Sequence, residues 1–364
     1  MMIKIDSNTL STWGHEWVKS TAFSVKNGAQ CALQATRDTA VARHVIGIQR
    51  IGLAMADSIN PPFEWRLLEN GEVAIFKDSL GDLVFGLLIH LEREEFAESF
   101  PLHEMNPVCG LLLEMIEARQ LVDKVRTPQW HLDCDAKRSL VAELNSFVHD
   151  YREELGSEAF NTRMNHYLAR SSEIEHGLLS MIDDAFQHCP QVMAIRMDLG
   201  YRPAESLPDD QDSVDLGDAS AHRDVLLTAL RNVFEDSLVA CAWKLEHCRE
   251  KGFGYHVLFL FDGCIVSDDV ATCEVIGDAW DVAATKGAGA HLSYNAYQAI
   301  SNAYCLGPIS RRSTKAIRSF KERFMTSMAK ADFCMQIRSD KAAQTFGMVR
   351  HEPAGKDRTN ELTS

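Results

Sequence analysis

The sequence predicts an α+β protein. A mainly helical N-terminal region, residues 1–189, is expected to precede a C-terminal domain, residues 190–350, whose split β-α-β antiparallel sheet carries helices on one face. Before residue 190, most apolar residues recur at the three- to four-residue spacing of amphipathic helices. After residue 190, patterns follow one another in the order strand, helix, strand, strand, helix, strand. We expect residues 351–364 to be a flexible tail.

In the N-terminal region, residues 29–56 are alanine-rich and have helical spacing. Two short strands, 63–68 and 72–76, are expected around the turn at Asn70 and Gly71. A buried helix is predicted over about 105–125. Further helices with a charged face follow, one with Asp135 as its N-cap and one over about 157–185. No motif in this region indicates a chemical function.

In the C-terminal region, Val192 to Leu199 alternates between apolar and polar residues as a strand does, at least around Arg196 and Asp198. The aspartate-rich segment 203–220 predicts a solvated loop. The remaining elements are predicted as a helix at 221–237, strands at 238–247 and 255–262, a helix at 271–285, a short strand or helix after 286–290, and a helix at 312–330.

Composition excludes several classes of protein. The ten cysteines contain no Cys-x-x-Cys pair, which argues against a structural zinc site and a disulfide scaffold. No apolar run is long enough to span a bilayer, and residues 1–7 lack the apolar core of a signal peptide. We therefore expect a cytoplasmic protein with no membrane contact. No Walker-type nucleotide loop is present, so ATP-driven work is not expected.

The net charge of −15 is unevenly distributed. Residues 311–351 contain ten Lys and Arg and three acidic residues, a net charge of +7, whereas residues 1–310 carry −21. A basic segment on an acidic body could bind single-stranded or duplex DNA locally through its phosphates, or it could be only a solvated helix face. The candidate DNA-binding residues are Arg311, Arg312, Lys315, Arg318, Lys321, Arg323, Lys330 and Arg338.

The most informative stretch is 243–262, which predicts two strands joined by a glycine-bearing turn, with Glu246 late on the first and His256 early on the second. A carboxylate that faces a histidine across adjacent strands is a pattern that can hold a divalent metal. A histidine satisfied by a backbone partner is at least as common, so the metal assignment of Glu246 and His256 remains open.

Five short motifs, in a fixed order, resemble the YagK/YfjJ C-terminal family, also called the inovirus-type gene-two proteins. They are Ile195-Arg-Met-Asp-Leu-Gly-Tyr201, Ala242-Trp-Lys-Leu-Glu246, Gly254-Tyr-His-Val-Leu-Phe-Leu260, Ile276-Gly-Asp-Ala-Trp280 and Gln344-Thr-Phe-Gly-Met348. These prophage and mobile-element proteins are similar to rolling-circle replication initiators of the His-hydrophobic-His (HUH) class. The resemblance covers about residues 190–350 and implies a replication-initiator-like fold. It also implies a Mg²⁺ or Mn²⁺ site and a tyrosine that attacks the scissile phosphate.

Carried over by motif, the resemblance assigns Glu246 as the metal-binding carboxylate and His256 as the second histidine. Gly254 stands where the first histidine is expected. The family's Tyr-x-x-Lys helix falls on Phe333 to Gln336, so the nucleophile and its lysine are also missing. Three absent groups predict that nicking has been lost. Substitutes could come from other residues: Tyr294, Tyr297 or Tyr304 as nucleophile, and His247, His291 or Asp198 as ligand.

Three functions follow from these observations. The first is a prophage- or plasmid-type protein that binds DNA, has a degenerate active site and has no enzymatic activity. The second is an active metal-dependent nickase with displaced catalytic groups, which would need Mg²⁺ or Mn²⁺. The third is a regulatory module that binds another phage or host protein and not DNA; the acidic body favours this one.

Overall fold

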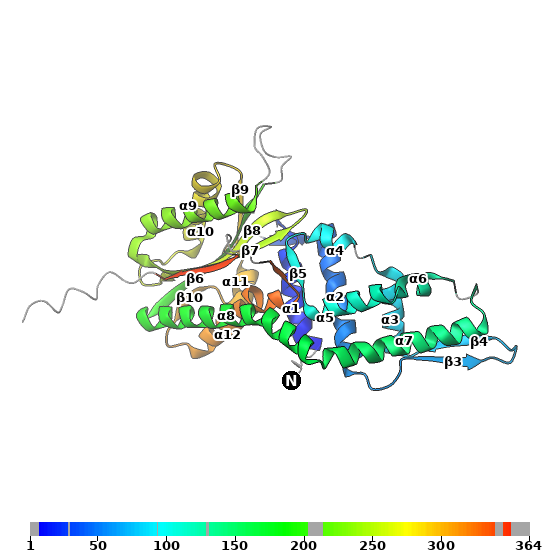
Figure 1. Cartoon of the computed structure of the whole chain (residues 1–364). Coiled ribbons are helices and arrows are strands. Elements are labelled where there is room, and N and C mark those ends of the chain that lie inside the picture. Colours follow the sequence, from blue (N-terminus) through cyan, green and yellow to red (C-terminus); the bar gives the residue numbers. More distant parts are fainter. Residues whose placement is uncertain are drawn as a thin grey trace, which may run out of the picture.

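The computed structural model describes residues 7–27, 30–92, 94–128, 131–202, 214–338 and 345–350. The chain forms a helical body and a sheet body, and the long helix α8 (Glu158–His188) runs from one into the other (Figure 1). The predicted tail 351–364 and residues 203–213 of the predicted acidic loop lie outside the described residues. No described helix combines the length and apolarity needed to cross a bilayer.

The helical body contains most of the predicted N-terminal elements. Its helices are α1 (Ser7–Ser20), α2 (Arg37–Asp57), α3 (Ser79–His90), α4 (Glu94–Ser99), α5 (Pro107–Ala118), α6 (Leu121–Arg126) and α7 (Cys134–Leu155). Its strands are β1 (Phe23–Asn27), β2 (Gln30–Gln34), β3 (Phe63–Leu67), β4 (Val73–Lys77) and β5 (His103–Met105). The β3–β4 hairpin confirms the two strands predicted around Asn70 and Gly71.

Three N-terminal boundaries differ from the prediction. The helix expected over 29–56 begins only at Arg37, because Gln30–Gln34 pairs with β1 and Thr36 caps α2. Helix α7 is capped by Asp133, whose side chain accepts a hydrogen bond from the Ala136 amide, and Asp135 lies inside its first turn. The helix expected over 105–125 is broken into α5 and α6 at Gln120, which adopts a left-handed backbone with φ of 52°.

The sheet body is built around β6 (Gln191–Tyr201), β7 (Leu238–Cys248) and β8 (Gly252–Asp262). Helix α9 (Leu216–Phe234) connects β6 to β7, and α10 (Asp269–Asp278), with a π-helical turn at Ala279–Ala284, follows β8. The chain continues through β9 (Gly289–Ser293), α11 (Gln298–Tyr304), β10 (Gly307–Ser310), α12 (Thr314–Met328), a 3-10 turn (Lys330–Phe333), β11 (Met335–Ile337) and β12 (Phe346–Arg350). Helix α9 starts five residues earlier than predicted, because Asp215 and Asp218 form a capping box.

The strands of the main sheet are antiparallel and lie in the order β10-β6-β8-β7-β12. Strand β9 pairs with the second half of β6, on residues 197–201, while β10 pairs with its first half. The segment after the glycine-rich residues 286–290, predicted as either a strand or a helix, is therefore a strand. The prediction of an α+β protein with an antiparallel sheet is confirmed.

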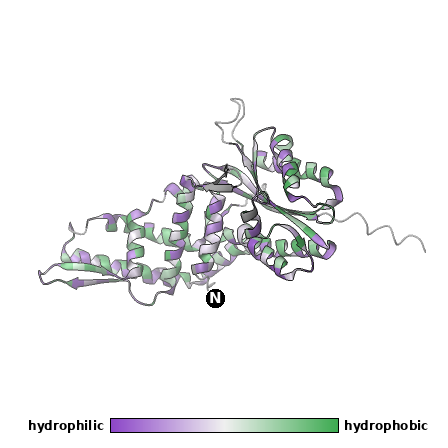
Figure 2. Ribbon diagram, turned by 180° about the vertical axis from the view of Figure 1, so that it is seen from behind, coloured by the Kyte–Doolittle hydropathy of each residue, from purple (hydrophilic) through white to green (hydrophobic). Residues whose placement is uncertain are grey.

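Helices cover both faces of this sheet, and the prediction of helices on one face is wrong. On one face, Met193, Ile195 and Met197 pack against α9 and α10. On the other face, Val192 and Ala194 pack beneath α8 and α12 (Figure 1). Both faces need a cover because β6, β7 and β8 are buried along most of their length, and Figure 2 shows their apolar colouring.

A short C-terminal segment completes the core of the helical body. Strand β11 pairs with β5, and Phe333, Cys334 and Met335 pack among the N-terminal helices. Three side chains hold the backbone carbonyls of this segment: the Tyr167 hydroxyl donates to Asp332 at 2.9 Å, the Asn106 amide to Phe333 at 2.7 Å and the Gln49 amide to Cys334 at 2.8 Å. The helical and sheet bodies are therefore packed through shared residues.

Replacing Asn106 with alanine is expected to destabilise the whole chain by about 2–3 kcal/mol. Its Oδ1 accepts from the Val108 amide at the start of α5, and its amide satisfies the buried Phe333 carbonyl. The variant loses a helix cap and leaves that carbonyl only a longer contact, from the Gln49 amide at 3.4 Å. Urea unfolding measures the loss, and the exposed Asn232→Ala on α9 is the control. A loss below about 0.5 kcal/mol would contradict the role given to Asn106.

Candidate polar site beneath helix α1

Five polar residues of the three central strands share one face of the sheet: Arg196 and Asp198 on β6, Lys244 and Glu246 on β7, and His256 on β8. The face follows from strand alternation, because each pair is two residues apart. His256 lies opposite both Asp198 and Lys244, and Glu246 lies opposite Gly254. The structure thus brings the two predicted metal-site residues, Glu246 and His256, to one place, together with the predicted substitute Asp198.

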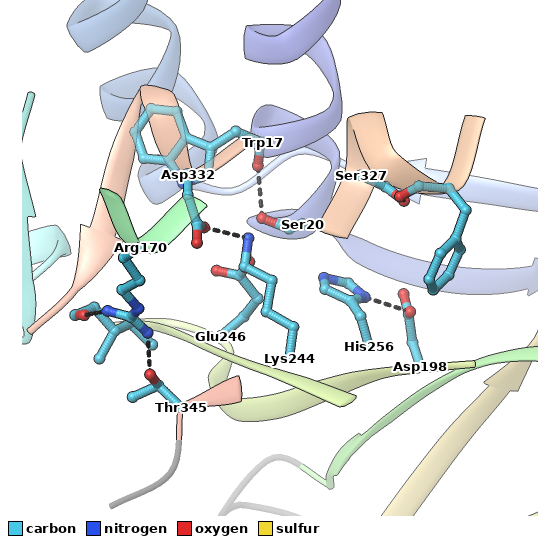
Figure 3. Close-up of polar contacts among 12 residues, drawn as sticks. Trp17, Ser20, Arg170, Asp198, Lys244, Glu246, His256, Ser327, Asp332 and Thr345 are labelled. Atoms are coloured by element: carbon cyan, nitrogen blue, oxygen red, sulfur yellow. Dashed lines mark hydrogen bonds and ion pairs between the residues drawn. The ribbon is translucent and has the colours of Figure 1, made fainter. Parts of the chain in front are cut away.

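Asp198 holds His256 and is itself fully engaged. Nδ1 of His256 lies 2.5 Å from Oδ1 of Asp198 (Figure 3). The Tyr294 hydroxyl donates to Oδ2 of Asp198 at 2.9 Å. Burial alone would raise the pKa of Asp198. The neighbouring His256 and Arg196 outweigh burial and hold the pKa well below its ordinary value. Asp198 is therefore a carboxylate that orients the His256 ring.

Lys244 places a buried ammonium between two carboxylates. Its Nζ lies 2.7 Å from Oε1 of Glu246 and 2.5 Å from Oδ1 of Asp332, and the side chains of Lys244 and Asp332 are 6% and 5% exposed (Figure 3). Burial would lower the pKa of Lys244, but attraction to both carboxylates raises it instead. The pKa of Glu246 is lowered, because Lys244 and His256 outweigh its burial. The Lys244 ammonium thus compensates the negative charge of Glu246, the carboxylate that the resemblance assigns to the metal.

Arg196 is enclosed by two of the candidate tyrosines. Its guanidinium lies 4.5 Å from the ring centroid of Tyr294 and 4.4 Å from that of Tyr304. The Tyr304 hydroxyl donates to Glu16 of α1 at 2.6 Å, and Glu16 also pairs with Lys19 at 2.7 Å. Burial raises the pKa of both tyrosine hydroxyls above the ordinary value. Neither hydroxyl is therefore activated as a nucleophile, and Tyr297 is also buried.

Helix α1 closes the site from above. Trp17 and Ser20 of α1, with Thr21 after it, lie over Glu246 and His256, and the two cavities that both Glu246 and His256 line are small, about 30 and 10 Å³. Such volumes are on the scale of one or two water molecules and do not admit a phosphate. A Cβ at Gly254, where the resemblance expects a histidine, would already lie 3.3 Å from the Leu199 carbonyl oxygen.

The residues do not fit the Mg²⁺ or Mn²⁺ that the resemblance implies. Glu246 is bound to an ammonium, Asp198 is bound to His256, and Asp332 completes the ion pair with Lys244. Hard divalent cations need several free oxygen ligands. Among the described residues, no group of three or more His, Cys, Asp or Glu side chains is placed to hold a metal ion.

Several predicted site residues lie elsewhere. His247 packs on Phe253, and His291 binds Asp281 at 3.0 Å, so neither joins His256. The predicted Tyr-x-x-Lys helix is absent: Phe333 ends a 3-10 turn and Gln336 lies on β11, both buried in the core of the helical body. Five charged residues that complete the network are not among the predicted site residues, namely Glu16, Lys19, Arg196, Lys244 and Asp332. A lysine inside an otherwise apolar strand was the available signal for Lys244.

The candidate DNA-binding residues of the basic segment fall into two groups, those engaged by other parts of the chain and those that are exposed. Lys321 pairs with Asp183 of α8, Lys330 with Glu175 at 3.5 Å, and the Arg338 side chain donates to the His103 carbonyl. The others are exposed, and no carboxylate pairs with them within the described ranges; they are Arg311, Arg312, Lys315, Arg318 and Arg323. We call Arg311, Arg312, Lys315 and Arg318 the α12 cationic cluster.

Replacing Lys244 with methionine is expected to cost about 3–5 kcal/mol of stability at pH 7, because Glu246 and Asp332 would stay buried without their cation. Protonation relieves that penalty, so the loss relative to the unsubstituted chain should shrink as the pH falls from 7 to 5. Urea unfolding at several pH values measures both effects.

The matched control adds Glu246→Gln and Asp332→Asn to Lys244→Met, which removes the buried charges together and should recover much of the loss. A single Lys244→Met variant within about 1 kcal/mol of the unsubstituted chain would show that the ammonium does not stabilise this site.

His103 gives the chain an acid-sensitive group beside this network. Neither of its ring nitrogens has a hydrogen-bond partner among the described residues, and burial lowers its pKa to about 4. Between pH 6.5 and 4 the unfolded chain binds a proton that the folded chain excludes. The stability contributed by neutral His103 is therefore present above about pH 6.5 and is lost as the pH falls toward 4.

As the pH falls from 7 to 4, the unsubstituted chain should lose about 3 kcal/mol more unfolding free energy than the His103→Leu variant, because of the lowered pKa of His103. Urea unfolding at the two pH values gives the difference. The exposed His149→Leu serves as control and should leave the fall unchanged. Equal falls in the His103→Leu variant and the unsubstituted chain would argue against this effect.

Comparisons of the chain with protein-family models, curated proteins and solved structures find no match. The resemblance of residues 190–350 to the YagK/YfjJ C-terminal family therefore stays a prediction from the motifs. Function must follow from the chemistry of the residues themselves.

Proposed function

We propose that this chain is a non-nicking DNA-binding protein whose sheet body is related to replication initiators of the His-hydrophobic-His class. Its DNA contact is the α12 cationic cluster. One observation carries the proposal: four exposed cations lie at the start of a helix. None of the four is paired with a carboxylate in the described ranges.

The topology supports the relationship to replication initiators. The elements β6, α9, β7, β8, α10 and β9 follow one another, and their strands lie in the order β9-β6-β8-β7. This is the order of a split β-α-β unit. Both connecting helices lie on one face, and Asp198, Glu246 and His256 lie on the other, where a substrate strand could have been bound before α1 covered it.

The electrostatics at the start of α12 support phosphate binding. Helix N-termini favour acidic side chains, because the unpaired amides there carry partial positive charge. The first turn of α12 contains no acidic residue, the Ser313 side chain makes no capping hydrogen bond, and Lys315 adds a further positive charge. A phosphate oxygen would relieve this excess of positive charge and accept from the free amides.

The loss of nicking is supported by the polar site. A nicking tyrosine must reach a phosphate beside a bound metal, but Tyr294 and Tyr304 are half-buried and their hydroxyls are hydrogen-bonded to Asp198 and Glu16. Lys244 compensates Glu246, and α1 leaves no room for a phosphate. The remaining Asp198–His256 pair then serves the packing of α1 and the sheet.

The test measures binding of a fluorescent 30-nucleotide single strand and a matching duplex to the full chain over a salt series. The Arg312→Gln/Arg318→Gln variant should bind at least about tenfold more weakly. On the single strand, its slope of log K against log salt should fall by about 1.4, which is 0.7 for each lost phosphate contact. The control, Arg231→Gln/Lys286→Gln, removes two exposed cations on the other side of the sheet and should leave the slope unchanged.

The same preparations are incubated with labelled single-stranded DNA and Mn²⁺ and separated on a denaturing gel. We expect neither a cleaved strand nor a covalent protein–DNA product. A covalent product that disappears in the His256→Ala variant would replace this proposal with an active nickase. Absence of salt-dependent binding, or equal slopes for the two double variants, would remove the DNA-binding role.

A further inference from the structure

A second surface, far from the start of α12 in sequence, lies between α1 and α2. We call it the α1–α2 groove. It is an open cavity of about 430 Å³ whose lining residues recur at intervals of three and four along each helix, so that each helix contributes one face. Its lining is formed by Ser11, Gly14, His15, Val18, Lys19 and Ala22 from α1 and the residues after it, and by Ala35, Thr39, Arg43, Ile46, Gly47 and Arg50 from α2 and the residues before it.

The two helices run antiparallel along this groove. At one end the Arg50 guanidinium contacts the Ser11 hydroxyl, and at the other the hydroxyls of Thr21 and Thr39 are 3.3 Å apart. Between them, a Cβ added at Gly14 would lie 2.7 Å from Ile46 Cδ1, so the helices are in close contact there. The groove therefore extends over about eleven residues of each helix, or roughly 16 Å.

The floor of the groove is small and apolar. Val18 and Ile46 are buried, and the neighbouring lining positions include alanines and glycines. At Gly47 an added Cβ would meet nothing within 4 Å, which marks open space above the helix. A trough of small residues between two helices is the shape that accepts the side-chain ridge of a third helix.

The rim of the groove is basic, although residues 1–310 carry a net charge of −21. Every titratable side chain in the lining is basic: His15, Lys19, Arg43 and Arg50. Lys19 is offset by Glu16, but the Glu16 carboxylate binds Tyr304 and is not part of the groove. Arg43 is exposed, and no carboxylate in the described ranges pairs with it. An anionic partner would find its complementary charges here.

We propose that the α1–α2 groove binds an acidic amphipathic helix of about three turns from a partner protein. Its apolar stripe would occupy the floor, and its carboxylates would pair with Arg43, Arg50 and His15. Helix-in-groove recognition uses apolar anchors at positions i, i+3 or i+4, and i+7, which the length of the groove accommodates. No Phe, Tyr or Trp is among the lining residues, and the large rings of these residues are what usually stack the bases of single-stranded nucleic acid.

The test begins with selection of a displayed library of random 16-residue helical peptides on the full chain. Enriched peptides should be acidic and should carry one apolar stripe. A fluorescent peptide made from the enriched pool is then titrated with the full chain and its variants. Gly47→Leu fills the open space and replaces glycine by a better helix former, so it should fold yet bind the peptide at least about tenfold more weakly. Arg43→Gln should weaken binding about three- to fivefold.

Two controls separate occlusion from other effects. Gly86→Leu on α3 also places a side chain where nothing lies within 4 Å of the new Cβ, and it should bind the peptide as the unsubstituted chain does. Gly47→Leu should retain the DNA binding assigned to the α12 cationic cluster, so failure of one proposal is distinguishable from failure of the other. The proposal is overturned if enriched peptides are basic or lack a stripe, or if Gly47→Leu binds them normally. It is also overturned if Gly47→Leu abolishes DNA binding, which would make the groove a nucleic-acid site.

Discussion

The structure depends on one buried cation. Lys244 ties β7 to Asp332, and the backbone carbonyls of Asp332, Phe333 and Cys334 are in turn held by Tyr167, Asn106 and Gln49. One ammonium thus links the central sheet to the core of the helical body. Buried charges are costly unless they are compensated, so Lys244, Glu246 and Asp332 must be close together whenever the chain is folded. That requirement fixes the position of the Lys330–Phe333 turn, on which α1 and α8 pack.

The same interaction decides what chemistry the site can perform. A lysine ammonium carries a single charge and is covalently attached to the chain. Unlike a divalent metal ion, it cannot dissociate from the site or coordinate the oxygens of a substrate. The ion pair of Lys244 with Glu246 therefore stabilises the packing of strands and helices. The Asp198–His256 pair has the geometry of a carboxylate that orients a metal-binding histidine, but α1 packs over it. The geometry of this pair and its cover by α1 together favour a structural role for Asp198 and His256.

Local patterns were predictable from the sequence, and contacts between distant segments were not. The strands expected at 192–199, 238–247 and 255–262 are β6, β7 and β8, because alternation and turn residues are local signals. The start of α9 differs from the prediction because Asp215 and Asp218, in the predicted solvated loop, form its capping box. The second covered face could not be inferred, because α8 and α12 are far from each other along the chain. The pairing of Lys244 with Asp332 was hidden for the same reason, and so was the closure of the site by Trp17.

The contribution of residues 331–335 to the core of the helical body has a consequence for synthesis. Strand β5, near residue 103, finds its partner strand β11 only at residues 335–337. On the ribosome, most of the chain must therefore emerge before the first body can finish packing, although that body begins at the N-terminus. Contacts of such high sequence separation slow folding and leave apolar surface exposed in the meantime. The nascent N-terminal helices would be natural clients for chaperones until the last elements arrive.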